Sequence, residues 1–444
     1  MAQSDNAAMR FVDLHLAAGR ADKTAFIEVD GDQRHLTYGA LAAGTGVVAT
    51  AMMAAGLRRE ERVAMLLLDT IDYTQLFWGA LKAGVVAVPL NTLLSTSIYD
   101  AILRDSRASA LFVSAALYPV VAPVLDDNPW LRTVVVVGGA APDGTTGFDD
   151  FMAGHAPADC CDVSPDDVAF WLYSSGSTGQ PKGVTHVHRS LGVTADTYGA
   201  GVLGVRENDL VYSAAKIFFA YGLGNAMTFP MSVGATTLLF AGRPTPDGVI
   251  DILARHLPTL FCGVPTLFSA MLAQLETGDV PDTALRLCIS AGEALPEATG
   301  KGWRAKMGVD ILDGVGSTEM LHIFLTNRQG DVRPNSSGKA VPGYQLRIVE
   351  DDGQLLSTGQ LGHLEVAGPT SAIMYWKQRE KSRETFKGKW TRTGDKYTVD
   401  ADGYYTYGGR SDDMMKVGGI YVSPFEVEGA LLENDAVLEV AVVG

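Results

Sequence analysis

Short apolar runs alternate with longer amphipathic stretches through the first two thirds of the chain. The runs of strand length cover residues 62–68, 85–90, 110–113, 133–137, 236–240, 259–262 and 285–290. Between them lie helix-like segments such as residues 73–83. This alternation is typical of α/β layers with helices on both faces of a sheet. Because 444 residues exceed what one hydrophobic core usually holds, we predict two or more domains.

The texture changes after about Ser337. Short strands are predicted at 345–349, 363–366 and 397–399. Asp-Gly pairs at 352–353 and 402–403 favour the positive backbone angles of hairpin turns. This region is therefore predicted to be a largely antiparallel sheet.

These patterns predict a large N-terminal domain over residues 1–410, with layered α/β subdomains to about 336 and a β-rich subdomain over about 337–410. Residues 411–444 are expected to form a hinge and the opening part of a small α+β C-terminal domain. The elements expected there are a hairpin over 413–422, a helix over 423–434 and a strand over 437–443.

A loop rich in glycine and hydroxyl side chains follows the apolar run 168–172, and residues 173–184 read YSSGSTGQPKGV. Glycines let backbone N–H groups approach a polyphosphate, hydroxyls add donors, and Lys182 supplies a positive charge. The usual P-loop template fails, because Pro181 takes the place of its second glycine and Gly183 that of its magnesium-binding hydroxyl. The loop indicates a nucleotide triphosphate site of another kind. An ordinary NTPase loop and a plain flexible loop are the alternatives.

A second informative segment, residues 313–319, reads DGVGSTE. Its two glycines permit close approach to a flat purine, and Thr318 can donate to a phosphate. Glu319 can help to hold Mg²⁺ across phosphate oxygens. The alternative is a capped turn that enters a helix.

These two segments resemble, in sequence and in order, motifs of the adenylate-forming superfamily of acyl- and aryl-CoA synthetases, adenylation domains and luciferases. So do SAGEA at 290–294, TGD at 393–395 and GRSD at 409–412. The resemblance covers nearly the whole chain and implies activation of a carboxylic acid as its acyl adenylate. It is strongest to the benzoate-type aryl-CoA ligases.

The resemblance implies an ATP and AMP site. Asp395 would accept hydrogen bonds from both ribose hydroxyls, and Arg410 would donate to the same sugar. Most relatives carry an aromatic residue that packs on adenine at the position of Val315. The branched aliphatic side chain here resembles the benzoate-type ligases and implies apolar packing in place of ring stacking. The implied site residues are Ser174, Ser175, Gly176, Ser177, Thr178, Gly179, Lys182, Gly292, Glu293, Ala294, Asp313, Gly314, Val315, Gly316, Ser317, Thr318, Asp395 and Arg410. The implied catalytic residues are Lys182, Thr318 and Glu319, with Glu319 as the magnesium ligand.

Residues 216–225, KIFFAYGLGN, and the run LHIF after Met320 resemble the acid pocket of benzoate-type ligases. A flat aromatic acid needs an apolar slot, and burial of one ring contributes about 2 to 3 kcal/mol. The implied lining residues are Ala220, Tyr221, Gly316, His322 and Ile323. Ordinary core packing is the alternative for each. His188 matches a histidine of the family, and we expect it to be structural.

The resemblance also assigns residues near the C-terminus. Asp412 matches the hinge about which the small domain turns, and Gly418 and Gly419 match the tunnel for the pantetheine arm of coenzyme A. The catalytic lysine that the family carries near the end of the small domain has no counterpart after Val422. We therefore expect these 444 residues to bind ATP and acid but to adenylate slowly.

Charge and hydropathy limit the partners. The net charge of −16 disfavours nucleic acid. No uncharged apolar run reaches the roughly 18 residues of a membrane span, and the first residues show no secretory signal. We expect a soluble cytoplasmic protein without membrane partners, and a homodimer stays open.

The sequence thus predicts ATP-dependent activation of benzoate or a substituted benzoate, followed by thioester formation with coenzyme A and release of AMP and pyrophosphate, with Mg²⁺ as cofactor. One alternative is an aryl-acid adenylating domain that loads a carrier protein. A second alternative is a non-catalytic module that binds an aryl acid or a nucleotide. The intact phosphate, magnesium and ribose motifs argue against the second.

Overall fold

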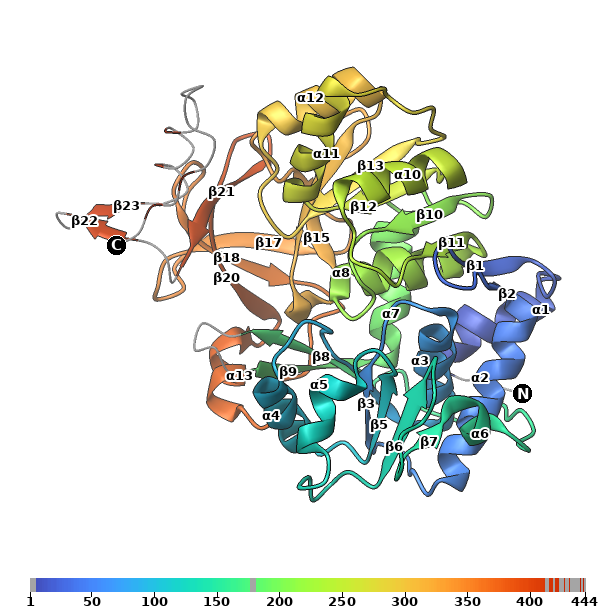
Figure 1. Cartoon of the computed structure of the whole chain (residues 1–444). Coiled ribbons are helices and arrows are strands. Elements are labelled where there is room, and N and C mark those ends of the chain that lie inside the picture. The colour runs from blue at the N-terminus through green and yellow to red at the C-terminus, as the bar shows by residue number, and fades with distance from the viewer. Residues whose placement is uncertain are drawn as a thin grey trace.

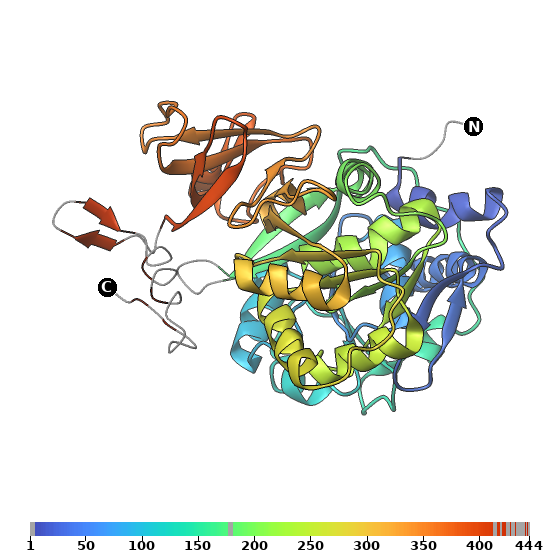
Figure 2. The same ribbon diagram turned by 90° about the horizontal axis from the view of Figure 1, so that it is seen from above.

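The computed structural model describes residues 5–175, 181–411, 415–417 and 420–422, and the single residues 427, 431, 440 and 442. Two large, mostly parallel sheets carry helices on their faces, and a smaller antiparallel sheet stands beside them (Figures 1 and 2). The predicted α/β class with an added antiparallel region is confirmed.

The first large sheet has seven strands in the order β7-β6-β5-β3-β4-β8-β9. Their bounds are β3 Arg62–Leu66, β4 Val86–Pro89, β5 Ala110–Ser114, β6 Thr133–Val137, β7 Thr146–Gly147, β8 Val168–Ser175 and β9 Pro181–Val187. All pairs are parallel except β8 with β9. In β3, Val63 and Met65 enter one buried cluster, whereas Ala64 and Leu66 enter another. Both faces of the sheet are covered, which is why its strands read as unbroken apolar runs.

The second large sheet has nine strands in the order β16-β15-β14-β13-β12-β10-β11-β1-β2. Their bounds are β1 Thr24–Glu28, β2 His35–Thr37, β10 Leu210–Ser213, β11 Thr236–Leu239, β12 Leu260–Gly263, β13 Leu287–Ala291, β14 Ile311–Gly316, β15 Ile323–Thr326 and β16 Lys339–Ala340. The six central strands are parallel, and β2, β15 and β16 pair antiparallel at the two edges.

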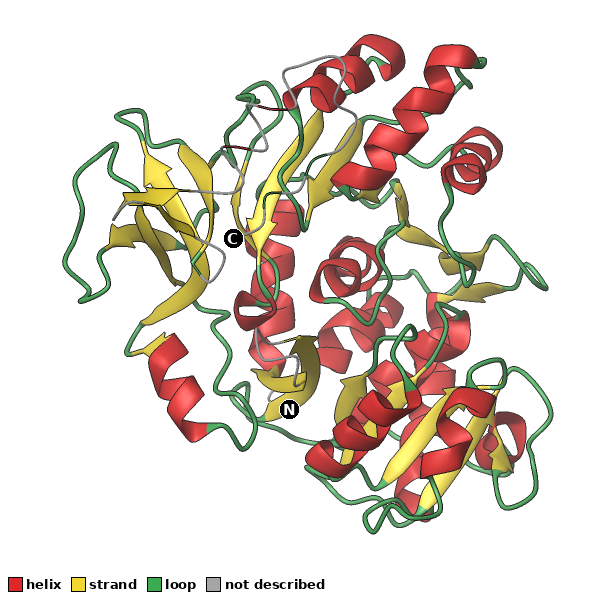
Figure 3. Ribbon diagram, turned by 60° about the vertical axis from the view of Figure 1, so that its left-hand side comes forward, coloured by secondary structure: helices red, strands yellow, loops and turns green. Residues whose placement is uncertain are grey.

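The α-helices connect the strands and cover both faces of each large sheet (Figure 3). Their bounds are α1 Leu14–Ala17, α2 Tyr38–Ala54, α3 Ile71–Ala83, α4 Thr96–Ser106, α5 Tyr118–Val121, α6 Phe148–Met152, α7 His188–Thr194, α8 Ala220–Leu223, α9 Phe229–Val233, α10 Pro246–His256, α11 Pro265–Thr277, α12 Glu297–Met307 and α13 Arg379–Thr385. The π-helical turns are η1 Met9–Asp13, η3 Ala195–Ala200 and η4 Gly224–Thr228, and the 3-10 turns are η2 Ala122–Val124 and η5 Thr318–Met320. Local chemistry sets several ends: the Thr37 hydroxyl accepts the Ala40 N–H at the start of α2, and Gly84 ends α3 with a φ of +73°.

The largest buried cluster fills the space between the two large sheets. It joins Leu41 of α2 and Phe77 of α3 to Val63 of the first sheet and Leu260 of the second. A separate cluster packs α10, α11 and α12 on the outer face of the second sheet, with Trp303 fully buried within it. Because one core spans both sheets, the strand ends that face each other hold a fixed relative position.

The antiparallel sheet has the order β17-β18-β20-β19, with β21 added on β20. Its bounds are β17 Gln345–Val349, β18 Gly362–Ala367, β19 Phe386–Lys387, β20 Trp390–Val399 and β21 Tyr405–Arg410. Gly353 and Gly403 have φ values of +89° and +82° in the predicted turns. β20 is longer than the strand expected at 397–399, because Trp390–Val399 pairs with three neighbours in turn.

One local expectation changes in the structure, and another is confirmed. The described residues of the segment predicted to be a phosphate loop lie in two paired antiparallel strands, with Ser174 in β8 and Lys182 in β9, and we call this pair of strands the phosphate hairpin. The predicted hairpin near the C-terminus is present as β22 Met415–Val417 and β23 Ile420–Val422, which pair antiparallel. The helix and strand expected after it lie almost wholly outside the described residues.

Candidate active site

A polar crevice of about 770 Å³ lies where the two large sheets meet the antiparallel sheet. It collects residues that are far apart in the sequence, from β8 and β9, the ends of β13 and β14, and the strands β20 and β21. The predicted nucleotide residues that line it are Ser174, Lys182, Gly292, Glu293, Ala294, Asp313, Gly314, Val315, Gly316, Ser317, Thr318, Glu319, Asp395 and Arg410. Parallel strands β13 and β14 end at one edge of the sheet, where such folds leave a crevice for ligands.

The remaining residues predicted for the nucleotide site, the hinge and the tunnel are not described by the structure. Gly176, Ser177, Thr178, Gly179, the hinge residue Asp412 and the tunnel residues Gly418 and Gly419 lie outside the described residues. The backbone of Ser175 ends β8, and its side chain is not described.

The turn after β14 is tightly built. A side chain at Gly316 would come within 2.6 Å of the His322 carbonyl oxygen, so only glycine fits there. The Ser317 hydroxyl accepts the Met320 N–H at 3.2 Å and starts η5, which carries Thr318 and Glu319. Two residues that the sequence assigned to phosphate and magnesium are thus held on one short turn.

Asp313 lies at the back of the crevice and is 8% exposed. Burial raises the pKa of its carboxyl group to about 8, against backbone hydrogen bonds that act in the opposite direction. Its Oδ1 has no hydrogen-bond partner among the described residues. A buried acceptor without a partner is costly, so this oxygen is well placed to accept from a ligand.

Asp395 and Arg410 face each other across β20 and β21, and Arg410 donates from Nη1 to Asp395 Oδ1 at 3.1 Å. Burial raises the pKa of Asp395, and the Arg410 guanidinium opposes that shift. Gly394, which precedes Asp395, has a φ of +85°, and a side chain there would come within 3.1 Å of the Arg410 guanidinium. The pair offers a carboxylate and a fork of donors to a single polyhydroxy group.

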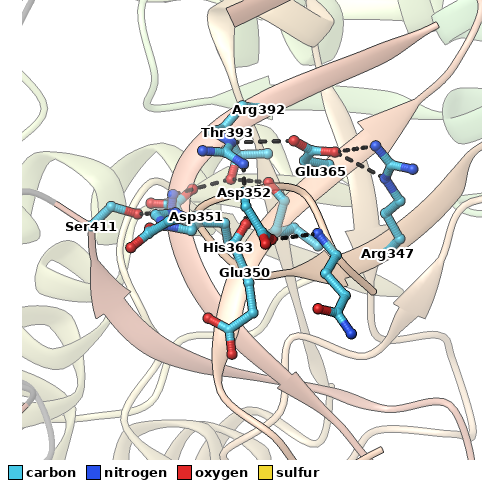
Figure 4. Close-up of polar contacts among 12 residues, drawn as sticks. Arg347, Glu350, Asp351, Asp352, His363, Glu365, Arg392, Thr393 and Ser411 are labelled. Carbon is cyan, nitrogen blue, oxygen red and sulfur yellow. Dashed lines mark hydrogen bonds and ion pairs between the residues drawn. The ribbon is translucent and has the colours of Figure 1, made fainter. Parts of the chain in front are cut away.

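A network behind this pair fixes the strand ends (Figure 4). Ser411 donates its N–H to the Gly394 carbonyl at 2.9 Å, and its hydroxyl contacts His363 Nδ1 at 2.9 Å. His363 Nε2 in turn lies 2.6 Å from Asp351 Oδ1. Next to it, the buried Glu365 pairs with arginines on both sides at 2.6 and 3.2 Å.

A second cavity, of about 630 Å³, is lined mainly by apolar side chains. All five predicted acid-pocket residues line it, namely Ala220, Tyr221, Gly316, His322 and Ile323. Leu93 and Phe219 line it too, and they are 84% and 47% exposed, so the cavity opens to solvent at that end. We call it the apolar slot.

Hydrogen bonds hold the aromatic wall of the apolar slot. The Tyr221 hydroxyl lies 3.2 Å from the Gly263 carbonyl and 3.1 Å from that of Ile289. His322 Nε2 donates to the Tyr221 carbonyl at 3.2 Å, and the ring packs on Phe229 at 4.5 Å. Burial lowers the pKa of His322 to about 3, so the imidazole is neutral at physiological pH.

The two cavities share Gly292, Gly316, Ser317 and Thr318 in their linings. The slot therefore reaches the crevice beside the turn that carries Glu319. A flat ligand in the slot can present a polar end to a nucleotide in the crevice.

The sequence did not identify several residues of the crevice. These are Ser337, Tyr375, Lys381, Glu384, Thr385, Arg392, Tyr397 and Tyr407. Arg392 directly precedes the TGD motif at 393–395 on β20, so that motif could have suggested it. Tyr375 carried no such signal, because it lies in a segment without regular secondary structure.

Neither His186 nor His188, at the end of the phosphate hairpin, lines the two cavities. His188 Nδ1 accepts the Ala7 N–H at 3.2 Å, in keeping with a structural imidazole. The structure contains no helix long and apolar enough to cross a membrane among its described residues. Within the same residues no three His, Cys, Asp or Glu side chains gather as metal ligands.

The sequence is similar to curated ligases along nearly its whole length. It is 52% identical to a benzoate–CoA ligase of Thauera aromatica, over 99% of this chain and 83% of that protein. It is 50% identical to a 4-hydroxybenzoate–CoA/benzoate–CoA ligase of Rhodopseudomonas palustris, over 99% of this chain and 81% of that protein.

Solved structures agree with the sequence comparison. A benzoate CoA ligase from Burkholderia xenovorans superposes with a TM-score of 0.91 at 45% identity, covering 99% of this chain and 86% of that one. The anthranilate CoA ligase AuaEII in complex with anthranoyl-AMP superposes with a TM-score of 0.95 at 41% identity, covering 100% of this chain and 85% of that one. The profile of the AMP-binding enzymes matches residues 15–376, and on this evidence the chain belongs to the AMP-binding enzyme family.

Proposed function

We propose that this protein is an AMP-forming aryl-CoA ligase that converts ATP, benzoate and coenzyme A into benzoyl-CoA, AMP and pyrophosphate. The observation that carries the proposal is the junction at Gly292, Gly316, Ser317 and Thr318, where the apolar slot meets the polar crevice. An aromatic ring in the slot would point its carboxylate at the α-phosphate of ATP in the crevice.

In the first step a carboxylate oxygen attacks the α-phosphorus, and the bond from that phosphorus to the pyrophosphate oxygen breaks. The carboxylate is already ionised, so the step needs no base, and positioning and charge neutralisation are what the protein supplies. Lys182 on β9 and Thr318 on η5 line the crevice and would contact the phosphates. In the second step the sulfur of coenzyme A attacks the acyl carbonyl, its proton is lost, and AMP leaves.

Glu319 is placed to act as the carboxylate ligand of a magnesium ion that binds together with ATP. Mg²⁺ in such sites usually takes one or two carboxylates, with substrate phosphates and water as the other ligands. Glu319 is a half-buried carboxylate in the crevice, which matches a metal held mainly by ATP. Bound there, the ion would neutralise charge on the phosphates. Asp395 and Arg410 would hold the ribose, and Asp313 would face the base.

The apolar slot supports an aromatic acid, since its inner wall is formed by Tyr221, His322 and Ile323. Coenzyme A is favoured over a carrier protein as the acceptor by the relatives. Those named as CoA ligases of benzoate share 52% and 50% identity with the chain, whereas a p-hydroxybenzoic acid–AMP ligase of Mycobacterium marinum shares 32%.

The test is a panel of acids incubated with the protein, ATP and Mg²⁺, with and without coenzyme A. Pyrophosphate exchange reports the first step, and mass spectrometry of the thioester reports the second. The rate of pyrophosphate exchange with benzoate should exceed the rates with acetate and hexanoate by at least about tenfold, because both of these acids lack the flat aromatic ring. Preference for acetate or for a long-chain acid would overturn the proposal. Binding titrations of benzoate and ATP should accompany the rates, so that slow turnover is not mistaken for an empty pocket.

A further inference from the structure

Tyr375 lies between two parts of the site that the sequence treats as separate. It lies in the segment 372–376, which follows the antiparallel strand β18 and forms an antiparallel bridge to β9 between Tyr375 and Val184. The Ala372 N–H donates to the Glu319 carbonyl at 2.7 Å, and the Trp376 N–H donates to the Gly183 carbonyl at 2.8 Å. The segment thus ties the turn η5 to strand β9 of the phosphate hairpin.

The side chain of Tyr375 contacts a functional group from each part. Its hydroxyl donates to Glu319 Oε1 at 2.7 Å. The Lys182 ammonium lies 4.7 Å from the centroid of the same ring, within range of a cation–π contact. One rigid ring therefore touches both the carboxylate and the ammonium of the phosphate half of the crevice.

The ring itself is held from behind. Tyr375 is 3% exposed and packs with Val184 and Ala372, and its ring centroid is 5.3 Å from that of Phe386. Its N–H donates to the Ser382 hydroxyl at 3.0 Å.

Resting on the proposed function, we propose that Tyr375 is the positioning residue of the magnesium and triphosphate half of the site. Its hydroxyl engages one oxygen of Glu319 and so directs the other oxygen to the ion. Its ring fixes the position of the Lys182 ammonium relative to the turn η5. Tyr375 acts through these two side chains and makes no bond to a reacting atom.

Two variants of Tyr375 distinguish the contact of its hydroxyl with Glu319 from the contact of its ring with Lys182, which a loss of folding would abolish together. Tyr375→Phe keeps the ring under Lys182 and removes the hydroxyl that orients Glu319. It should weaken the binding of ATP in the presence of Mg²⁺ by about fivefold to tenfold, the range expected for one hydrogen bond to a charged group. Binding of ATP in EDTA should change by less than about twofold. Tyr375→Leu also removes the ring, so it should weaken ATP binding in EDTA as well.

Tyr38→Phe is the matched control, because it removes a buried tyrosine hydroxyl that donates to the Ala235 carbonyl at 2.7 Å, and neither residue lines the crevice or the slot. This variant should leave the ratio of the two dissociation constants at the wild-type value. In a Glu319→Ala background, Tyr375→Phe should have no further effect on that ratio, since Tyr375 would act through Glu319. Thermal unfolding of every variant checks that the chain is folded.

The outcomes distinguish this inference from the proposed function. If wild type binds ATP more tightly with Mg²⁺ and Tyr375→Phe keeps the full gain, the inference is overturned and the proposed function stands. An additional loss from Tyr375→Phe in the Glu319→Ala background would also overturn it. If wild type shows no gain from Mg²⁺, the proposed function fails and the inference fails with it.

Discussion

The polar crevice and the apolar slot share one wall but are built in opposite ways. The crevice draws its lining from pieces of chain between Ser174 and Ser411 and leaves a buried oxygen of Asp313 without a partner among the described residues. The slot takes most of its lining from two stretches, residues 214–244 and 291–323, and Tyr221 in its wall bonds to two backbone carbonyls. A site for a charged ligand keeps polar groups unsatisfied until the ligand arrives, whereas a site for an apolar ring needs few of them, although His322 Nδ1 in the wall of the slot is also buried without a partner among the described residues.

The largest expected effect tests the charge side of this comparison. Glu319→Gln should slow benzoate-dependent pyrophosphate exchange by about 10²-fold or more, the scale of losing one preorganised electrostatic contact. The dissociation constant of benzoate should not change, because Glu319 lines the crevice and not the slot. Glu297→Gln on α12 provides a control, and equal rates for both variants would contradict the assigned role of Glu319.

The second prediction concerns the effect of the buried Asp313 carboxyl group on the free energy of unfolding. The pKa of Asp313 is raised to about 8 by burial, from 3.8. Between these values the folded chain keeps a proton that the unfolded chain releases, so the free energy of unfolding falls as the pH rises. Asp313→Asn removes this loss and should raise stability at pH 8.5 by about 2 to 3 kcal/mol, while weakening ATP binding.

Urea unfolding at two pH values measures this effect. Asp209→Asn is the opposite case, because Arg286 pairs with that buried carboxylate at 2.6 Å. It should destabilise the protein at pH 8.5. A loss of stability for Asp313→Asn as well would mean that Asp313 is satisfied in the folded protein.

A third prediction concerns the pH dependence of stability at His188, which lines neither cavity. Burial lowers the pKa of His188 to about 4, and its Nδ1 must be unprotonated to accept the Ala7 N–H. A depressed pKa stabilises the fold above the unfolded value of 6.5, and that stability is lost as the pH falls toward 4. His188→Asn should therefore reduce the loss of stability between pH 7.5 and pH 5 by about 2 kcal/mol. An unchanged pH dependence in urea titrations would show that this histidine does not titrate with folding.

The smallest expected effect tests the apolar slot. Ile323→Val removes one methylene from its wall, which should weaken benzoate binding by about threefold to tenfold. ATP binding should remain as in wild type. Ile348→Val in β17 makes the same change in a buried position outside the site, and it should change the affinity for neither benzoate nor ATP. A shift in ATP affinity for Ile323→Val would mean that the two cavities are not independent.

The sequence carries a local signal where function depends on consecutive residues. The run 313–319 could be assigned because two glycines, a threonine and a carboxylate must follow one another in a turn that approaches a nucleotide. The tight fit of Gly316 against His322 agrees with that prediction. The residues missed, above all Tyr375, belong to no such run, and Tyr375 meets Glu319 across 56 positions.

Periodicity and glycine act over a few neighbouring residues, so the α/β class and the turn chemistry could be predicted from the chain alone, whereas the residues of both cavities were assigned largely through the resemblance to the adenylate-forming superfamily. That the slot reaches the crevice, that Asp395 stands opposite Arg410 and that Tyr375 bonds to Glu319 became known from the folded chain. These contacts depend on the register of strands and on the shared core between the two large sheets, and such long-range packing leaves no local pattern to read.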